Sequence, residues 1–150
     1  MIDPEVHNEP DVLELSVQIA ADPVTVFGYF TDPDRYAQWM GGQASLDPVP
    51  GGGYRIRMRG GVEALGRFVE VDPPRRVVFT WGWTHGHEVA PGSTRVEVTL
   101  APHDGGTRVV LRHHGLPETQ RGHHRGGWEL YLHRLSIRAG GGDPGPDPNG

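Results

Sequence analysis

Hydrophobic and polar positions alternate in several short segments of the chain, and this pattern predicts β-strands. VLELSVQIA, from Val12, alternates in the way expected of a strand with one buried face. Further short strands are predicted at 54–58, 63–71, 77–83, 94–100 and 107–114, and in 63–71 both faces carry apolar groups. From residue 54 onward turn residues separate the segments and no helical pattern intervenes, so these segments predict an antiparallel meander.

Two short segments near the N-terminus repeat their large apolar residues at helical spacing instead. ADPVTVFGYFTD carries Asp22 as a helix cap and Pro23 at the first helical position. DPDRYAQWM follows directly, with Asp32 or Asp34 as its cap. We therefore expect two short helices after the first strand.

A third and longer helix is predicted from about Gln120 to Arg138. At 1.5 Å per residue it is roughly 28 Å long, enough to lie across the whole sheet. Its first turns contain RGHHRGG, although glycine costs about 1 kcal/mol relative to alanine inside a helix. A sheet that curves around such a helix leaves a space between the two. We expect this weak turn to lie at the mouth of that space, where small residues admit a ligand. The stripe predicted to face the sheet consists of His124, Trp128, Tyr131 and Leu135.

The length of 150 residues fits one domain with a single core. We place this domain at residues 1–139. Residues 140–150, GGGDPGPDPNG, offer almost no apolar surface to bury, so we predict a disordered tail. Deletion of this tail is expected to leave the stability unchanged.

The order of these elements and five segments of sequence point to a known family. The segments are ADPVTVFGYFTDPDRYAQWM, PGGGYRIRMRG, GRFVEVDPPRRVVFTW, GGTRVVLRHHGLP and GGWELYLHRL. Together they resemble the START-like helix-grip (SRPBCC) superfamily, specifically its activator-of-heat-shock-ATPase-like branch, from Val12 to about Arg138. The resemblance implies an α+β helix-grip fold. In this fold a curved antiparallel sheet wraps around one long C-terminal helix, with two short helices after the first strand, and encloses a cavity.

Charge and hydropathy argue against several classes of partner. The formal net charge is -5 and the arginines form no basic run, so we predict no binding to nucleic acid. No apolar stretch reaches the ~20 residues that span a bilayer, so we predict no membrane insertion. The N-terminal residues lack the features of a secretory signal. We expect a cytoplasmic protein.

The residue types that are missing narrow the chemistry. The sequence contains neither cysteine nor lysine, which excludes thiol nucleophiles, cysteine-based metal sites and Schiff bases on lysine. None of the serines lies in a G-x-S-x-G motif, and no phosphate-binding glycine motif occurs. Histidine pairs with the spacing H-E-x-x-H or H-x-x-x-H are also absent from the helices. We therefore predict no cofactor and no metal.

Strand direction gathers histidines and tryptophans at one end of the predicted cavity. His113 ends the inward face of the last strand and His124 begins the inward stripe of the long helix, so we expect them to approach each other. His85, His87, His114 and His123 are predicted to join them. A solvated cluster, a polar patch that contacts a ligand and a metal site are the three alternatives for these histidines.

The candidate ligand-binding residues share an inward position on a strand or a helix. They are Trp39, Phe79, Trp81, Trp83, His113, His124, Trp128 and Tyr131. Trp39 and Phe79 are assigned mostly to the core, because apolar residues that face a sheet interior need no other role.

The leading functional hypothesis is the binding of a small hydrophobic or aromatic molecule in the cavity between sheet and helix. The alternative is a polyketide cyclase or hydratase-type enzyme that acts on an aromatic or polyketide substrate in the same cavity. It would use His113 or His124 as its acid or base. The family name suggests a third alternative, a domain that modulates a chaperone ATPase. The identity of the ligand and the oligomeric state are left open, with a homodimer as one alternative.

Overall fold

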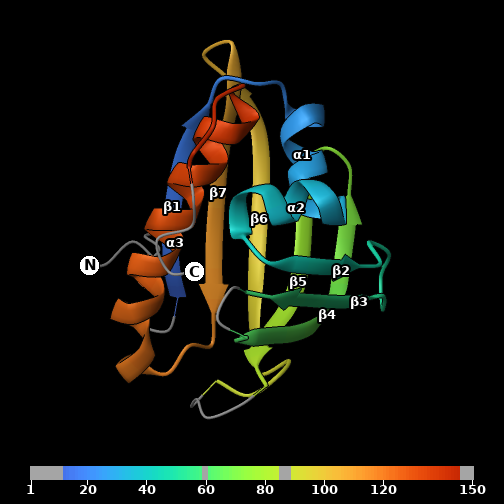
Figure 1. Ribbon diagram of the computed structural model, residues 1–150, viewed down its shortest axis with the longest axis vertical. Helices are drawn as coiled ribbons and strands as arrows, with labels where there is room; N and C mark the ends of the chain where they lie inside the picture. The colour runs from blue at the N-terminus through green and yellow to red at the C-terminus, as the bar shows by residue number, and fades with distance from the viewer. Residues whose placement is uncertain (1–11, 59–60, 85–88, 146–150) are drawn as a thin grey trace, which may run out of the picture.

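A computed structural model describes residues 12–58, 61–84 and 89–145 (Figure 1). Seven strands in this part of the chain form one sheet, in the order β1-β7-β6-β5-β4-β3-β2. Every neighbouring pair is antiparallel, as the sequence predicts. The strands are β1 (Val12–Ile19), β2 (Gln43–Leu46), β3 (Gly53–Arg57), β4 (Glu63–Asp72), β5 (Arg76–Trp83), β6 (Thr94–His103) and β7 (Gly106–His114).

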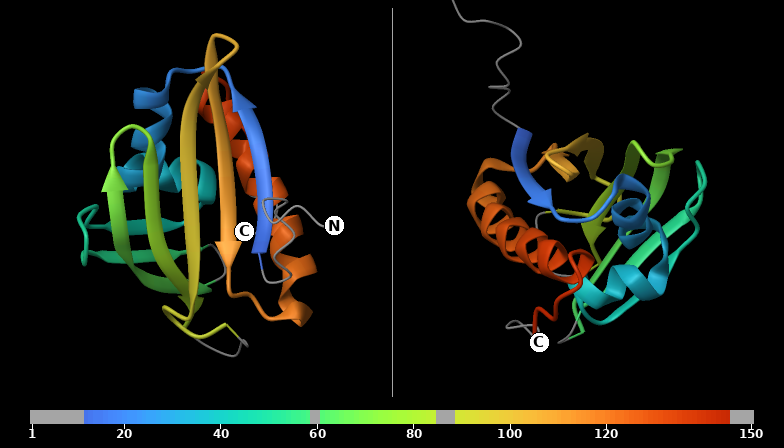
Figure 2. Two further views of the ribbon diagram at one scale, coloured as in Figure 1. Left: turned by 180° about the vertical axis from the view of Figure 1, so that it is seen from behind. Right: turned by 90° about the horizontal axis from the view of Figure 1, so that it is seen from above.

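Three helices in the described residues cover the concave face of this sheet. The helices are α1 (Pro23–Thr31), α2 (Pro33–Met40) and α3 (Glu118–Ala139). Seen from above in Figure 2, the sheet curves around α3, and α1 and α2 lie beside it on the same face. This arrangement is the predicted helix-grip fold. None of the described helices combines the length and the apolar composition that crossing a bilayer requires.

Local capping explains where the two short helices begin. The carboxylate of Asp22 accepts a hydrogen bond from the backbone N–H of Thr25 at 2.8 Å, and Pro23 occupies the first turn. Asp32 plays the same part for α2, accepting from the N–H of Asp34 at 2.9 Å. These side chains satisfy N–H groups that have no partner inside the helix. Of the two caps proposed for the second helix, Asp32 is the one used.

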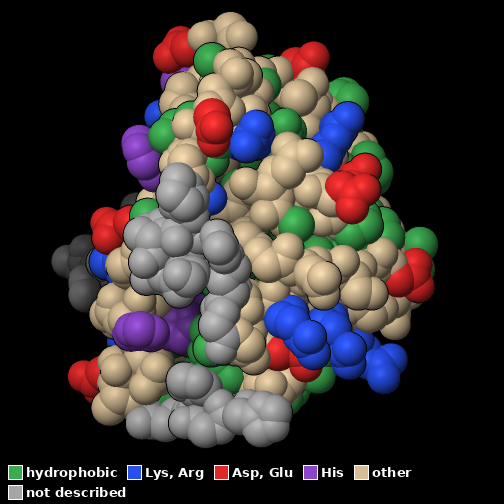
Figure 3. Space-filling model, in the orientation of Figure 1, with side chains coloured by type: hydrophobic (Ala, Val, Ile, Leu, Met, Phe, Trp, Pro, Cys, Tyr) green, Lys and Arg blue, Asp and Glu red, His purple; other side chains and the backbone are tan. Residues whose placement is uncertain are grey.

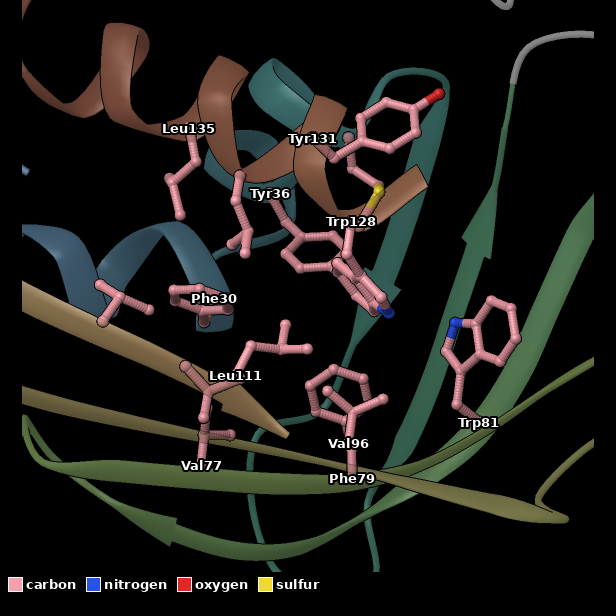
Figure 4. Close-up of a cluster of buried hydrophobic side chains, with 14 of the residues drawn as sticks. Phe30, Tyr36, Val77, Phe79, Trp81, Val96, Leu111, Trp128, Tyr131 and Leu135 are labelled. Atoms are coloured by element: carbon pink, nitrogen blue, oxygen red, sulfur yellow. The ribbon is translucent and has the colours of Figure 1, made fainter. Parts of the chain in front are cut away.

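The core lies between the inner face of the sheet and the helices (Figure 4). Tyr36 of α2 and Tyr54 of β3 are fully buried, and their hydroxyl oxygens are 2.5 Å apart. The ring of Tyr54 stacks on Phe79, with ring centroids 4.3 Å apart. Burial raises the pKa of both tyrosines, so both phenols are neutral at physiological pH. The hydroxyl pair satisfies polar groups that an apolar core would otherwise leave unpaired.

A buried arginine connects α3 to α2 and to the chain that follows α3. Arg134 is only 6 % exposed, and its Nε donates to the carbonyl oxygen of Trp39 at 3.1 Å. Its guanidinium also donates to the carbonyl oxygen of Pro144 at 3.4 Å. The backbone N–H of Gly142 donates to Ile137 at 2.8 Å. The first residues after α3 therefore contact the domain.

Removal of residues 142–150 should lower the melting temperature by a few degrees, in contrast to the sequence-based expectation. Arg134 would lose one acceptor, which costs about 1 kcal/mol, or roughly 2–4 °C in a domain of this size. Differential scanning calorimetry of the full and shortened chains measures the shift. Removal of residues 146–150 alone is the control. Equal melting temperatures for all three chains would show that the contact with Pro144 contributes nothing.

Candidate binding pocket

A cavity of about 620 Å³ lies between the first half of α3 and the inner face of the sheet. The wall opposite α3 is formed by residues of α2, β3, β5 and the turn after β3. These residues are Met40, Ile56, Met58, Val62, Trp81 and Trp83. Figure 4 shows Trp128 reaching from α3 toward the sheet, with Trp81 standing on the sheet at some distance. The cavity therefore has apolar walls on both sides.

Glycines create the space on the helix side of the cavity. Gly122 and the adjacent pair Gly126 and Gly127, about one turn further along α3, all line it. A Cβ atom added at any of the three would meet nothing within 4 Å. The backbone of α3 therefore carries no side chain at these positions, and no neighbouring side chain of the described residues fills the space beside it. Residues of the RGHHRGG segment therefore border the cavity.

Aromatic rings form a large part of the cavity wall. Trp81 and Trp83 of β5 contact each other edge to face, with ring centroids 4.5 Å apart. His124 of α3 packs edge-on against Trp81 at 5.1 Å and lies 6.1 Å from Trp83. Tyr131 completes the helix side. Such rings can stack on a flat ligand and bury its apolar surface.

His113 lies behind this wall and takes part in a chain of hydrogen bonds. The hydroxyl of Thr94 donates to the carbonyl oxygen of Trp81 at 2.7 Å. Nε2 of His113 lies 2.8 Å from the same hydroxyl oxygen, and Nδ1 of His113 accepts from Nε1 of Trp128 at 3.1 Å. The single hydroxyl hydrogen of Thr94 is already used, so the histidine must donate through Nε2. The ring is therefore neutral and protonated at Nε2.

Burial keeps this histidine neutral over the physiological range. His113 is 0 % exposed. Burial, with smaller contributions from the nearby His124 and His114, lowers the pKa of His113 to about 3. Both ring nitrogens have partners, so this side chain has no proton position left for a ligand. His113 is placed to support Trp128, and does not line the cavity.

Of the eight candidate residues, the structure brings five to the cavity and leaves three in the core. The five are Trp81, Trp83, His124, Trp128 and Tyr131. Trp39, Phe79 and His113 are absent from the described lining and have exposures of 0, 1 and 0 %. Nε1 of Trp39 donates to the carbonyl oxygen of Tyr29 at 2.9 Å, which accounts for its polar atom within the core.

The predicted histidine cluster is only partly assembled in the described residues. His113 and His124 do approach each other, with ring centroids 5.6 Å apart. His123 lines the cavity, and Figure 3 shows histidine side chains on the surface over the first half of α3. His114 projects to the opposite face of the sheet, where Nε2 lies 2.9 Å from a carboxylate oxygen of Glu97. The reason is strand alternation, which puts neighbours on opposite faces.

Two of the predicted histidines, His85 and His87, lie outside the described residues. Among the residues that the structure does describe, no three His, Asp or Glu side chains are grouped closely enough to hold a metal ion.

Several lining residues were not candidates from the sequence. Met40, Met58, Val62 and Leu130 border the cavity. Leu130 lies on the flank of α3 that also carries Gly126 and Gly127, beside the stripe that faces the sheet. A second, glycine-containing flank next to an apolar stripe was the signal that could have identified it.

Two other hollows in the described structure have charged linings. One, of about 720 Å³, lies on the outer face of the sheet and includes Arg55 and Arg67. Figure 3 shows arginine side chains gathered over β3 and β4. The other, of about 390 Å³, lies between β1 and α3 and includes Arg125 and Glu129. Neither hollow brings aromatic rings together as the cavity beneath α3 does.

Comparison with known families agrees with this architecture. The family described as "Activator of Hsp90 ATPase homolog 1-like protein" matches residues 20–139. The chain belongs to this family. No curated protein sequence matches it significantly.

Solved structures show how widely this family fold recurs. An AHSA1-like protein from Rhizobium etli is 42% identical, with a TM-score of 0.73, over 91% of this chain and 86% of that one. DynU16, a putative protein in the dynemicin biosynthetic locus, is 26% identical, with a TM-score of 0.78, over 89% of this chain and 49% of its own. The Aha1 dimer from Colwellia psychrerythraea shares the fold at 21% identity and a TM-score of 0.74, over 87% of this chain and 98% of that one.

Proposed function

We propose that this AHSA1-like protein binds a small hydrophobic or aromatic molecule in the cavity beneath α3. The observation that carries the proposal is a cavity of about 620 Å³ with aromatic and aliphatic walls, bordered by a helix that lacks side chains at Gly126 and Gly127. Small-molecule sites have volumes of roughly 300–1,000 Å³ and mainly apolar linings. Burial of apolar ligand surface and stacking on indole rings supply the affinity.

The lining also favours a ligand without charge. Among the described residues that border the cavity there is no aspartate, glutamate or arginine. An ionised group buried there would lose its hydration without a partner of opposite charge, which is strongly unfavourable. The polar groups that line the cavity include the imidazoles of His123 and His124 and the phenol of Tyr131. These can orient a neutral polar substituent at the edge of an apolar ligand.

Binding is tested first with the intact chain. Flat aromatic compounds such as naphthalene should bind in the micromolar range, about -8 kcal/mol, and change the tryptophan fluorescence. Native mass spectrometry of freshly purified protein should reveal any small molecule that it retains. Absence of both signals across a panel of aromatic compounds and fatty acids would contradict the proposal.

Replacement of Gly127 by leucine should strongly weaken naphthalene binding while making the helix more stable. Leucine has a helix propensity close to that of alanine, about 1 kcal/mol better than glycine. Its side chain enters the open space above Gly127 and occupies part of the cavity. We expect at least a tenfold loss of affinity together with a melting temperature that is equal or higher.

Arg125→Leu is the matched control, because this exposed residue lies on another flank of α3 and borders a different hollow. It adds the same side chain to the same helix and should leave naphthalene affinity unchanged. Fluorescence titration and thermal unfolding of both variants give the two readouts. Equal affinities for Gly127→Leu and the parent chain would place the ligand elsewhere.

The second candidate function is a cyclase or hydratase-type reaction in the same cavity. It is favoured by His124, which borders the cavity beside Trp81, and by the similarity to a protein of a biosynthetic locus. Of the two histidines considered as acid or base, only His124 lines the cavity. A His124→Gln variant that retains ligand affinity but loses turnover of an aromatic or polyketide substrate would support the enzyme. Unchanged turnover in this variant would reject His124 as the acid or base, and absence of turnover in the parent chain would reject the enzyme.

A further inference from the structure

Behind Trp128, outside the cavity lining, lies a series of buried hydrogen bonds that the proposed binding function does not itself require. Thr94 is 4 % exposed, His113 is 0 % exposed and Trp128 is 6 % exposed. Burying three polar side chains together is costly unless each donor meets an acceptor. Here each one does, through contacts of 2.7, 2.8 and 3.1 Å.

The donor and acceptor of each hydrogen bond in this series are fixed by the groups at its two ends. The carbonyl oxygen of Trp81 can only accept, so the hydroxyl of Thr94 donates to it. The indole nitrogen of Trp128 can only donate, so Nδ1 of His113 accepts. The Nε2 hydrogen of His113 must then point to the oxygen of Thr94. Only one tautomer and one ring orientation of His113 satisfy all three contacts.

The indole N–H of Trp128 is consequently directed toward β7 and away from a ligand. Trp128 lines the cavity, but His113 and Thr94 do not. The wall that Trp128 contributes is therefore the carbon surface of its ring. An indole N–H that pointed into the cavity would instead favour the binding of ligands that carry a hydrogen-bond acceptor at that position.

We propose that Thr94 and His113 are positioning residues that turn the N–H of Trp128 out of the cavity and so make the site select ligands without an acceptor at this wall. This inference rests on the proposed binding function. It assigns the pair a role in specificity, which acts through Trp128 and involves no contact with the ligand.

The proposal is tested with naphthalene and quinoline, which have the same shape and differ by one aromatic nitrogen that accepts a hydrogen bond. His113→Phe keeps a ring at this position but removes the acceptor for Trp128. The freed indole N–H should then donate a hydrogen bond to the quinoline nitrogen. We expect the ratio of the quinoline and naphthalene dissociation constants to fall about fivefold, the worth of one ordinary hydrogen bond. An unchanged ratio would overturn the proposal.

A second pair of variants tests the proposal if His113→Phe fails to fold. Thr94→Val removes the oxygen that holds the Nε2 hydrogen of His113, whereas Thr94→Ser keeps it. The quinoline to naphthalene ratio should fall in Thr94→Val and remain at the parent value in Thr94→Ser. Equal ratios in the two variants would show that the hydroxyl of Thr94 has only a structural role.

Nuclear magnetic resonance provides a readout that does not depend on a ligand. In the parent chain and in Thr94→Ser, the indole N–H of Trp128 should exchange slowly with D₂O, and the ring nitrogens of His113 should show the Nε2–H tautomer. Exchange should be faster in Thr94→Val. Fast exchange in the parent chain, or the other tautomer, would overturn the assigned orientation. If neither probe binds the parent chain, the binding function and the specificity fail together, while these signals still decide how Trp128 is held.

Discussion

Replacement of Trp128 by alanine should lower the free energy of unfolding by about 3–5 kcal/mol, the usual range for a large buried aromatic residue. The side chain is 6 % exposed, and it packs between the sheet and α3. Its loss also removes the donor to Nδ1 of His113. A buried acceptor without a partner adds about 1–3 kcal/mol to the cost of a substitution, so the effect belongs at the upper end of this range.

The same variant should weaken naphthalene binding, since the indole forms part of the cavity wall. Urea unfolding followed by circular dichroism gives the stability, and a competition titration with a fluorescent aromatic dye gives the affinity. Trp83→Ala is the matched control, because Trp83 borders the cavity but is only partly buried. It should weaken binding with a smaller loss of stability. A destabilised Trp128→Ala chain that binds naphthalene as before would assign Trp128 to the core alone.

Acidification from pH 7.5 to pH 5 should destabilise the parent chain by about 2 kcal/mol more than a His113→Gln chain. The pKa of His113 is lowered to about 3 by burial, with a smaller effect of His124 and His114. In the unfolded chain the imidazole takes up a proton near pH 6.5. Between these two pH values only the unfolded state binds the proton, so acid favours unfolding. The contribution of His113 is complete above pH 6.5 and decreases by about 1.4 kcal/mol per pH unit below it.

Urea unfolding at the two pH values checks this prediction. The parent chain and the variant contain the same other titrating groups, so their difference isolates His113. His133→Gln, in which an exposed histidine of the same helix is replaced, should show the full loss of the parent chain. If the parent and His113→Gln chains lose stability equally on acidification, His113 is not held neutral by the fold.

The order of elements was predictable because each one follows a local rule. Alternation put Val77, Phe79 and Trp81 on the buried face of β5, and all three are at most 5 % exposed. Asp22 with Pro23 marked the start of α1. The final helix begins at Glu118, two residues before the predicted start, because the chain becomes helical directly after Pro117. Periodicity alone does not show where the first turn of a helix begins.

The pocket was less predictable, because its shape depends on contacts between distant segments. Alternation correctly turned His113 inward, but its partners are Thr94, 19 residues earlier, and Trp128, 15 residues later. Those contacts make it a buried support, and a sequence pattern does not reveal them. Met58 and Val62 enter the wall because of the turn that joins β3 to β4. The glycines were recognised as unusual, whereas the width of the space above them depends on the curvature of the sheet.

The two halves of α3 differ in how much they pack against the rest of the domain. Its second half carries Leu135, which is fully buried, and Arg134, which connects it to the end of α2. On the cavity flank of its first half, Gly122, Gly126 and Gly127 contact nothing where their side chains would be. Mutations at these three positions can therefore alter the shape of the cavity while the residues that hold the helix in place stay unchanged. Under the proposed binding function, single substitutions on this flank would therefore change which ligands fit, at little cost in stability.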